Sequence, residues 1–177
     1  YALGGVNGAY RKELVFVADK VPALGFKTYR LAPRAGWPSF GSCLIVGERS
    51  LENRYYRIDW DASGKITHLW DKGLARDWAD QLAAHGIGQL VVRAVQSGET
   101  QPAGPMQLKP GQTGPVYASV TLSGQAIGCP PVTQEIVLYD QLNRVDFSNR
   151  LLKDATPFLE LYFAFPLAMC KPQFRYE

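Results

Sequence analysis

The stretch from Leu51 to Lys72 reads LENRYYRIDWDASGKITHLWDK. Two runs rich in aromatic and branched residues flank the tetrapeptide DASG, whose Asp can bond its own backbone and whose Gly accepts a positive φ. The stretch therefore predicts a β-hairpin. Its first arm has the period-two pattern of a strand buried on one side. The apolar face carries Tyr56, Ile58 and Trp60, and the polar face carries Arg57, Asp59 and Asp61.

Length and composition indicate an ordinary globular chain. Its 177 residues suffice for one substantial domain, or for one domain and an incomplete second one. Apolar residues make up 46% and charged residues 20%, and no apolar run approaches the roughly 20 residues of a membrane helix. The 19 basic and 16 acidic residues are mixed along the chain rather than clustered. We therefore expect neither a membrane nor a nucleic acid as partner.

The three cysteines, Cys43, Cys129 and Cys170, are widely separated and odd in number. This spacing predicts neither a disulfide framework nor a close-spaced zinc site, so buried or incidental thiols are the simpler interpretation. The first residue is Tyr1, with no initiator Met and no basic-then-apolar leader. We therefore expect the sequence to be a piece of a longer chain.

The N-terminal part is predicted to contain two strands and a linker. Residues 1–10 are rich in Gly and small residues and are expected to be irregular. Strand-like runs at 14–18 and 26–31 flank a Pro- and Gly-containing loop, which predicts a strand, loop, strand unit. Residues 32–42 hold two prolines and two glycines, a density typical of a linker. We expect a domain boundary there.

The middle of the chain contains the one segment that favours a helix. In residues 74–84, Leu, Trp and Leu recur every four residues, and Gly86 follows as a cap. A strand is predicted at 89–96. Residues 97–114, in which Gly, Pro, Gln and Thr dominate, predict a long exposed loop. A further strand is predicted within 115–127.

The C-terminal part predicts a second hairpin and a last strand. Residues 133–139 and 144–153 form the hairpin arms, and one face of the second arm is apolar. Residues 158–165 are almost continuously apolar, as expected of a strand covered on both sides. About nine strands and at most one helix indicate packed antiparallel sheets.

No catalytic constellation is visible in the sequence. Acid–base hydrolysis of a sugar needs two carboxyl groups facing each other across roughly 5 to 10 Å, and nothing pairs them here. The only histidines, His68 and His85, lack the close helical spacing of a zinc pair. Nucleophile elbows and phosphate loops are also absent. The following acidic residues are therefore expected to be solvated surface charge: Asp59, Asp61, Asp71, Asp77, Asp80 and Asp146.

Four tryptophans could stack on sugar rings, although large aromatic residues in a β-protein usually belong to the core. They are Trp37, Trp60, Trp70 and Trp78. Because Trp37 falls in the expected linker, it is the least core-like of the four.

Four blocks of sequence, in the same order, resemble the region downstream of the catalytic domain in family 38 glycoside hydrolases, the α-mannosidases. The first is VFVADKVPALGFKTYRL at 15–31, and the second is the hairpin stretch at 51–72. The third spans 134–147, with its Tyr-Asp and Arg-Val-Asp pairs, and the fourth is AFPL at 164–167. The resemblance covers most of the chain.

This resemblance implies an all-β fold in two parts. Residues 1–42 would be the tail of a small β-domain plus a linker. Residues 43–177 would be the N-terminal part of a large antiparallel β-sandwich of the galactose-mutarotase type, a supersandwich left incomplete at Glu177. The zinc ligands and the carboxylate nucleophile of the family lie in an N-terminal α/β domain that is absent here. No catalytic or metal-binding residue is therefore assigned, and zinc is expected only in that domain.

The resemblance also points to one loop. The segment His85-Gly86-Ile87-Gly88-Gln89 takes the place of a family loop that can approach the active site across the domain interface. Gln89 could offer its amide to a sugar hydroxyl and is the candidate substrate-binding residue. The simpler interpretation is that Gln89 merely starts a strand.

Three functions are consistent with these observations. The first is a support role, in which this chain shapes the active site of an α-mannosidase-like glycosidase without catalysing anything itself. The second is a non-enzymatic carbohydrate-binding or assembly module. The third is a self-sufficient mutarotase-like enzyme, for which only His68 and His85 are available. Expected partners are the parent's own catalytic domain, a carbohydrate substrate, and a second copy bound through the apolar strand at 158–165.

Overall fold

The computed structural model describes residues 2–3, 12–32, 35–36 and 39–170. Within these ranges every regular element is a strand, and neighbouring strands pair antiparallel. The predicted all-β class is therefore confirmed. The described residues contain no helix long and apolar enough to cross a lipid bilayer.

The strands, in chain order, are β1 (Ala2–Leu3), β2 (Lys12–Glu13), β3 (Ile45–Val46), β4 (Ser50–Glu52), β5 (Tyr56–Trp60), β6 (Ile66–Asp71), β7 (Arg76–Asp77), β8 (Gln89–Ala94), β9 (Thr100–Pro102), β10 (Gln107–Thr113), β11 (Tyr117–Ala126), β12 (Cys129–Tyr139), β13 (Val145–Leu151) and β14 (Leu159–Ala164).

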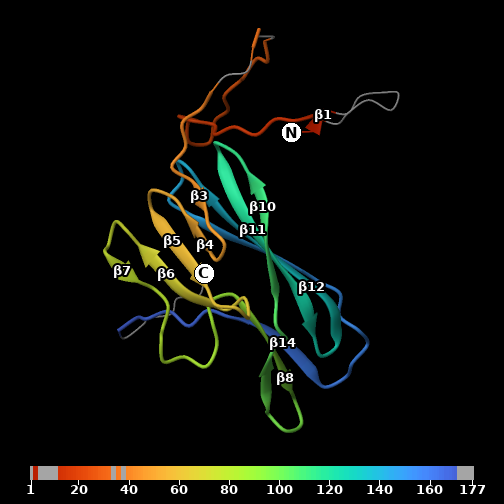
Figure 1. Ribbon diagram of the computed structural model, residues 1–177. Coiled ribbons are helices and arrows are strands. Elements are labelled where there is room, and N and C mark those ends of the chain that lie inside the picture. The colour runs from red at the N-terminus through yellow and green to blue at the C-terminus, as the bar shows by residue number, and fades with distance from the viewer. Residues whose placement is uncertain (1, 4–11, 33–34, 37–38, 171–177) are drawn as a thin grey trace.

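Two sheets share the main core and form a β-sandwich. One has the order β3-β4-β5-β6-β7 and the other β10-β11-β12-β13. A third sheet, β14-β8-β9, packs through a smaller core on the end of β12. Figure 1 shows β8 and β14 at one end of the sandwich and the N-terminal segment, in orange and red, leaving the other end. The main core is built from Leu51, Ile58, Trp60, Ile66, Leu69, Ala79, Ile87, Ala118, Val120, Leu122, Ile136 and Leu138.

The predicted first hairpin is formed by β5 and β6. In its turn, Asp61 Oδ1 accepts hydrogen bonds from the backbone N–H groups of Ser63 (2.8 Å) and Lys65 (3.0 Å), and Gly64 has a φ of 82°. On β5, Ile58 and Trp60 are buried as the alternation predicts. The turn chemistry and the facing pattern of this hairpin are thus both confirmed.

A β-bulge in this hairpin reverses the alternation of β6. Asp59 lies opposite His68, whereas the next residue, Trp60, lies opposite Ile66, so that one extra residue of β6 is left unpaired between them. Beyond the bulge the phase of the strand is inverted. Leu69 is buried, and its neighbours His68 and Trp70 are exposed on the outer face of the sheet.

The second predicted hairpin is formed by β12 and β13. β12 also pairs with β11, whose register shifts between Gly124 and Ala126. The polar junction that joins both hairpins lies at their ends. Asn53 donates to the Tyr139 carbonyl (2.8 Å) and accepts from two backbone N–H groups of the following turn. Buried Asp140 accepts from the Cys43 N–H (2.6 Å) and from Arg54 (3.2 Å). These bonds fix one end of the sandwich.

The helix predicted at 74–84 is wrong. This segment contains β7 and turns, and Leu74 and Leu82 are exposed. The cause is local competition by aspartates, whose side chains offer the backbone an alternative to helical hydrogen bonds. Asp71 Oδ1 accepts from the Leu74 N–H, Asp77 Oδ1 from the Ala79 N–H, and Asp80 Oδ1 from the Leu82 N–H.

The long loop predicted at 97–114 is also wrong, because it contains β9 and β10. The side chains of β10 are mostly exposed, and its pairing with β11 shifts between Pro110 and Thr113. β10 is an edge strand, so one of its sides needs no hydrogen-bonding partner and the strand tolerates proline and glycine. Its sequence therefore resembles that of a loop.

The two strands predicted at 14–18 and 26–31 are not formed either. The segments carry no backbone ladder and meet through side chains, with the Phe16 and Tyr29 rings 4.9 Å apart and Lys27 Nζ donating to the Asp19 carbonyl. Strand-forming residues need a partner strand, and Phe26 is 86% exposed instead. The start expected to be irregular contributes β1, which pairs with β2. Trp37 lies outside the described residues.

The last strand, β14, is formed as predicted but is not covered on both sides. It pairs with β8 alone and is an edge of its sheet within the described ranges. Phe158, Tyr162 and Phe165 are each at least 45% exposed. An apolar edge of this kind is a template for pairing with another strand.

The Asp61 turn predicts a dependence of stability on pH. Partial desolvation opposes ionisation of this carboxyl, but hydrogen bonds from Ser63 and Lys65 outweigh it and lower its pKa below the ordinary 3.8. The carboxylate therefore stabilises the fold above that pH, and this contribution is lost as the pH falls through the folded-state pKa. We expect Asp61→Asn to lower the free energy of unfolding at neutral pH and to flatten its decline below about pH 4. Thermal melts from about pH 7 to about pH 2 measure this, and an unchanged acid decline in the variant would contradict it.

The β14 edge predicts self-association. Covering exposed apolar surface is worth roughly 25 cal/mol per Å² before association entropy is subtracted, so a small contact suffices for weak dimers. We expect sedimentation equilibrium at tens of micromolar to show dimers, since about −7 kcal/mol already registers there. The double variant Phe158→Lys/Tyr162→Lys is expected to be monomeric, whereas Leu24→Lys, an exposed apolar site elsewhere, should still associate. A strictly monomeric state of the unsubstituted chain would refute the prediction.

Candidate functional site

The loop at 85–89, which joins the turns after β7 to β8, is held by three other strands. Ile87 forms a β-bridge with β6. The Gly88 N–H donates to a carbonyl at the end of β14 (2.7 Å). The Gly88 carbonyl in turn accepts from Gln134 Nε2 on β12 (2.8 Å). A loop tied at these points presents its side chains in a fixed position.

Two glycines let the loop approach its neighbours this closely. A Cβ at Gly86 would lie 2.6 Å from Lys65 Cγ and 3.1 Å from the Ile66 carbonyl oxygen. Gly88 has a φ of 71°, and a Cβ there would lie 2.9 Å from a ring carbon of Phe147. Neither position has room for a side chain, so both glycines are required by packing.

Gln89 is the first residue of β8 and is partly exposed. Its side-chain Oε1 accepts a hydrogen bond from the Gly86 N–H (2.8 Å), while its backbone N–H donates to the Gly86 carbonyl (3.2 Å). Within the described residues the Nε2 group of Gln89 has no hydrogen-bond partner. The side chain is therefore fixed through its oxygen and keeps two N–H donors for another group.

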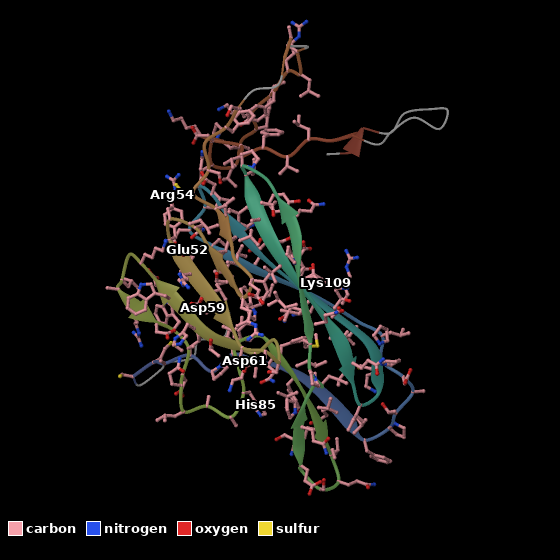
Figure 2. All side chains as sticks on the ribbon, viewed as in Figure 1. Glu52, Arg54, Asp59, Asp61, His85 and Lys109 are labelled. Atoms are coloured by element: carbon pink, nitrogen blue, oxygen red, sulfur yellow. The ribbon has the colours of Figure 1, made fainter. Side chains whose placement is uncertain are left out.

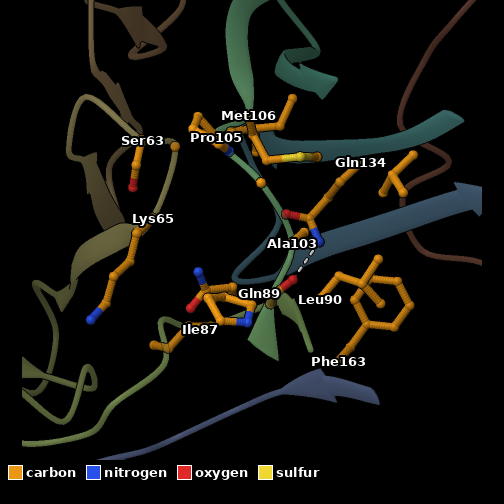
Figure 3. Close-up of a pocket in the computed structure, with 16 residues that line it drawn as sticks. Ser63, Lys65, Ile87, Gln89, Leu90, Ala103, Pro105, Met106, Gln134 and Phe163 are labelled. Atoms are coloured by element: carbon orange, nitrogen blue, oxygen red, sulfur yellow. Dashed lines mark hydrogen bonds between the residues drawn. The ribbon is translucent and has the colours of Figure 1, made fainter. Parts of the chain in front are cut away.

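A first hollow of about 210 Å³ lies on one side of the loop and is shown in Figure 3. It opens between the turn of the β5–β6 hairpin, the start of β8 and the segment before β10. Most of its lining is apolar, and the polar side chains in it include Lys65, Gln89 and Gln134. A small concave site with few polar groups suits one ring-sized ligand or a projecting side chain of a partner domain.

A second hollow of about 100 Å³ lies on the other side of the loop and shares Lys65 and Ile87 with the first. Figure 2 labels Asp61 and His85, which both line it. His85 Nδ1 is buried and has no hydrogen-bond partner in the described part of the chain. The remaining polar side chains of this hollow are Thr67, Asp80 and Gln81.

The two histidines have different surroundings. His68 is half-exposed, lines neither hollow, and is bonded to Asp77 (Nδ1 to Oδ2, 2.6 Å), whereas His85 faces the second hollow. Among the described residues, no group of three or more His, Cys, Asp and Glu side chains could hold a metal ion. The zinc ion that the sequence resemblance implies therefore has no candidate donor set among these residues.

Two further residues of the site were not singled out from the sequence. Gln134 is 7% exposed and bonds both Gly88 and Asn149, and Lys65 borders both hollows. A signal for Gln134 did exist, because Val132, Ile136 and Leu138 share its face of β12, so that a polar side chain stands at an inward position. A buried amide needs partners, and the loop provides one.

Comparison with known families assigns this sandwich to a class. The family model described as "Glycosyl hydrolases family 38 C-terminal domain" matches residues 51–177, which is more than two thirds of the chain. The chain therefore belongs to glycosyl hydrolase family 38, and the resemblance noted in the sequence is confirmed. None of the curated proteins compared with the chain matches it.

The packing of the loop predicts a selective effect of Gly88→Ala. A non-glycine residue at φ 71° costs about 1 to 2 kcal/mol, and the contact with Phe147 adds a further steric cost. Gly98 is a matched control, because it has a φ of 73° and a Cβ added there would meet no atom within 4 Å. We expect Gly88→Ala to lower the free energy of unfolding by about 2 to 4 kcal/mol, and Gly98→Ala by about 1. If urea titrations showed the same loss of unfolding free energy in both variants, the loop would not be tightly packed.

Proposed function

We propose that this chain is the non-catalytic sandwich of an α-mannosidase-like glycosidase and that its loop at 85–89 shapes one wall of the active site of a separate catalytic domain. Membership of family 38 supports the enzyme class. The observation that carries the proposal is the loop itself, which glycine packing and three hydrogen-bonded neighbours hold beside two hollows.

Gln89 is the residue best placed to touch a substrate. Its side-chain oxygen already accepts a hydrogen bond from the Gly86 N–H, so the amide group has little freedom to rotate. The two N–H donors of that amide therefore keep a defined direction. A sugar hydroxyl can accept such a bond, which is worth about 0.5 to 1.5 kcal/mol net. Gln89 would thus contribute to substrate positioning and not to bond cleavage.

Catalysis itself is assigned to the other domain. The carboxylate nucleophile and the zinc ion that the family resemblance implies would both be held there. The residues of this chain would then exclude water at one side of the site and orient the sugar through amide donors, which is how a supporting wall affects a reaction.

The alternative of a non-enzymatic carbohydrate-binding module is favoured by a different part of the molecule, the outer face around the exposed side chain of Trp70. That face can bind a sugar without any contribution from the loop at 85–89. A module of this kind would bind a sugar but serve no catalytic domain, and this distinguishes it from the support role.

The support role predicts a kinetic effect of Gln89→Ala in the full-length protein. Because one positioning hydrogen bond is removed, we expect kcat/KM on an aryl α-mannoside to fall by about threefold to tenfold, with the melting temperature nearly unchanged. Gln101→Ala, an exposed amide on β9 that lines neither hollow, is the control and should leave kcat/KM unchanged.

The isolated 177-residue chain is expected to hydrolyse no aryl α-mannoside. Hydrolysis by this chain alone, or full activity of the Gln89→Ala enzyme, would overturn the support role. Loss of activity in both glutamine variants would indicate a general loss of folding and would contradict a specific contribution from Gln89.

A further inference from the structure

The outer face of the β3–β7 sheet carries an exposed tryptophan. Trp60 is 4% exposed and Trp78 is partly buried against the core, whereas Trp70 is 41% exposed. The bulge in the β5–β6 hairpin places Trp70 outward, and Arg57 of β5 and Asp77 of β7 stand directly opposite it in the register. We call this surface the Trp70 face: Glu52, Arg57, Asp59, His68, Trp70 and Asp77.

One half of the Trp70 face is a fixed ionic network. Arg57 donates to both carboxylate oxygens of Asp59 (3.0 Å from Nε to Oδ2 and 2.9 Å from NH2 to Oδ1). It also donates to Glu52 (3.3 Å), which in turn accepts from Lys72 (2.6 Å). Figure 2 labels Glu52 and Asp59 on neighbouring strands of this sheet. A bidentate arginine in a network keeps its remaining donors in a defined direction.

The other half is built on Asp77. Its Oδ1 accepts from the Leu69 and Ala79 N–H groups (3.0 Å each), and its Oδ2 contacts His68 Nδ1 (2.6 Å). Desolvation opposes ionisation of Asp77, but these hydrogen bonds prevail and lower its pKa, so that it is a carboxylate at neutral pH. His68 is bound through Nδ1, and its other ring nitrogen has no hydrogen-bond partner among the described residues, so it can meet an outside one.

This chemistry matches a neutral sugar chain. A hexose has an apolar face of C–H groups that covers an indole ring, and hydroxyl groups around its edge that both donate and accept hydrogen bonds. The Trp70 face supplies one aromatic ring, the N–H donors of Arg57 on one side of that ring, and carboxylate acceptors on both sides. Its three carboxylates (Glu52, Asp59 and Asp77) outnumber Arg57, even when the adjoining Lys72 is added, and this disfavours an anionic polymer such as a nucleic acid.

We propose that the Trp70 face is a binding surface for neutral hexose polysaccharides, separate from the loop at 85–89. Trp70 lines neither hollow beside that loop. The surface is built on paired strands and locked side chains, so little entropy is lost on binding. It would hold a glycan chain against the sandwich independently of where the glycan is cleaved.

Affinity electrophoresis of the 177-residue chain in gels that contain soluble α-mannan tests this, with β-glucan and xylan gels as a panel. We expect retardation in at least one neutral polysaccharide. Trp70→Ala should lower the affinity for that polysaccharide at least tenfold, and Trp70→Phe, which keeps an aromatic ring, should lower it less. Tyr29→Ala removes a similarly exposed aromatic side chain outside the sheet and should bind like the parent. Circular dichroism spectra establish that each variant is folded.

The inference is overturned if no neutral polysaccharide retards the folded chain, or if Trp70→Ala and Tyr29→Ala are retarded equally. Because these measurements need no catalytic domain and no change at Gln89, their outcome is independent of the support role.

Discussion

The contact between the inward faces of two sheets determines most of this structure. Leu51 and Ile58 on one sheet and Ile136 and Leu138 on the other are fully buried in the same core. In a strand, a slip of one residue would turn every one of these side chains outward. The core therefore fixes the register of the strands, and the register in turn decides which side chains reach the surface.

Both surfaces with a proposed role depend on that register. The loop at 85–89 is tied to the core through Ile87, which is buried, and through Gln134, which stands in line with the buried residues of β12. In the β3–β7 sheet, strand β6 buries Leu69 in the core and exposes Trp70 on the outer face. Packing energy thus positions polar groups that contribute little to stability themselves.

The sequence predicted the elements whose own side chains decide their conformation. The β5–β6 hairpin was predictable because its alternation and the Asp61 turn agree. The segment at 74–84 was mispredicted, since a helical period counts apolar residues and does not register aspartates that bind backbone N–H groups. The edge strand β10 was mispredicted because an exposed strand with a proline resembles a loop.

The site was predictable only in part, for a similar reason. The position of Gln89 came from resemblance to a family and not from any pattern in the residues. The exposure of Trp70 depends on one bulge, where a single unpaired residue exchanges the two faces of β6, and no composition rule reveals such a residue. Contacts set by register between distant strands require the three-dimensional arrangement.

The polar junction at Asn53 and Asp140 has a consequence for how the chain folds. Three of its hydrogen bonds join residues 86 to 97 positions apart in the sequence, so neither hairpin can complete it alone. Closing the junction therefore requires two hairpins to meet across a long intervening segment, which costs loop-closure entropy. Topologies dominated by such distant pairings fold in milliseconds to seconds, whereas local ones fold far faster. Strand edges that stay unpaired until those distant contacts form are open to contacts with other chains, so the topology itself links slow closure to a risk of association.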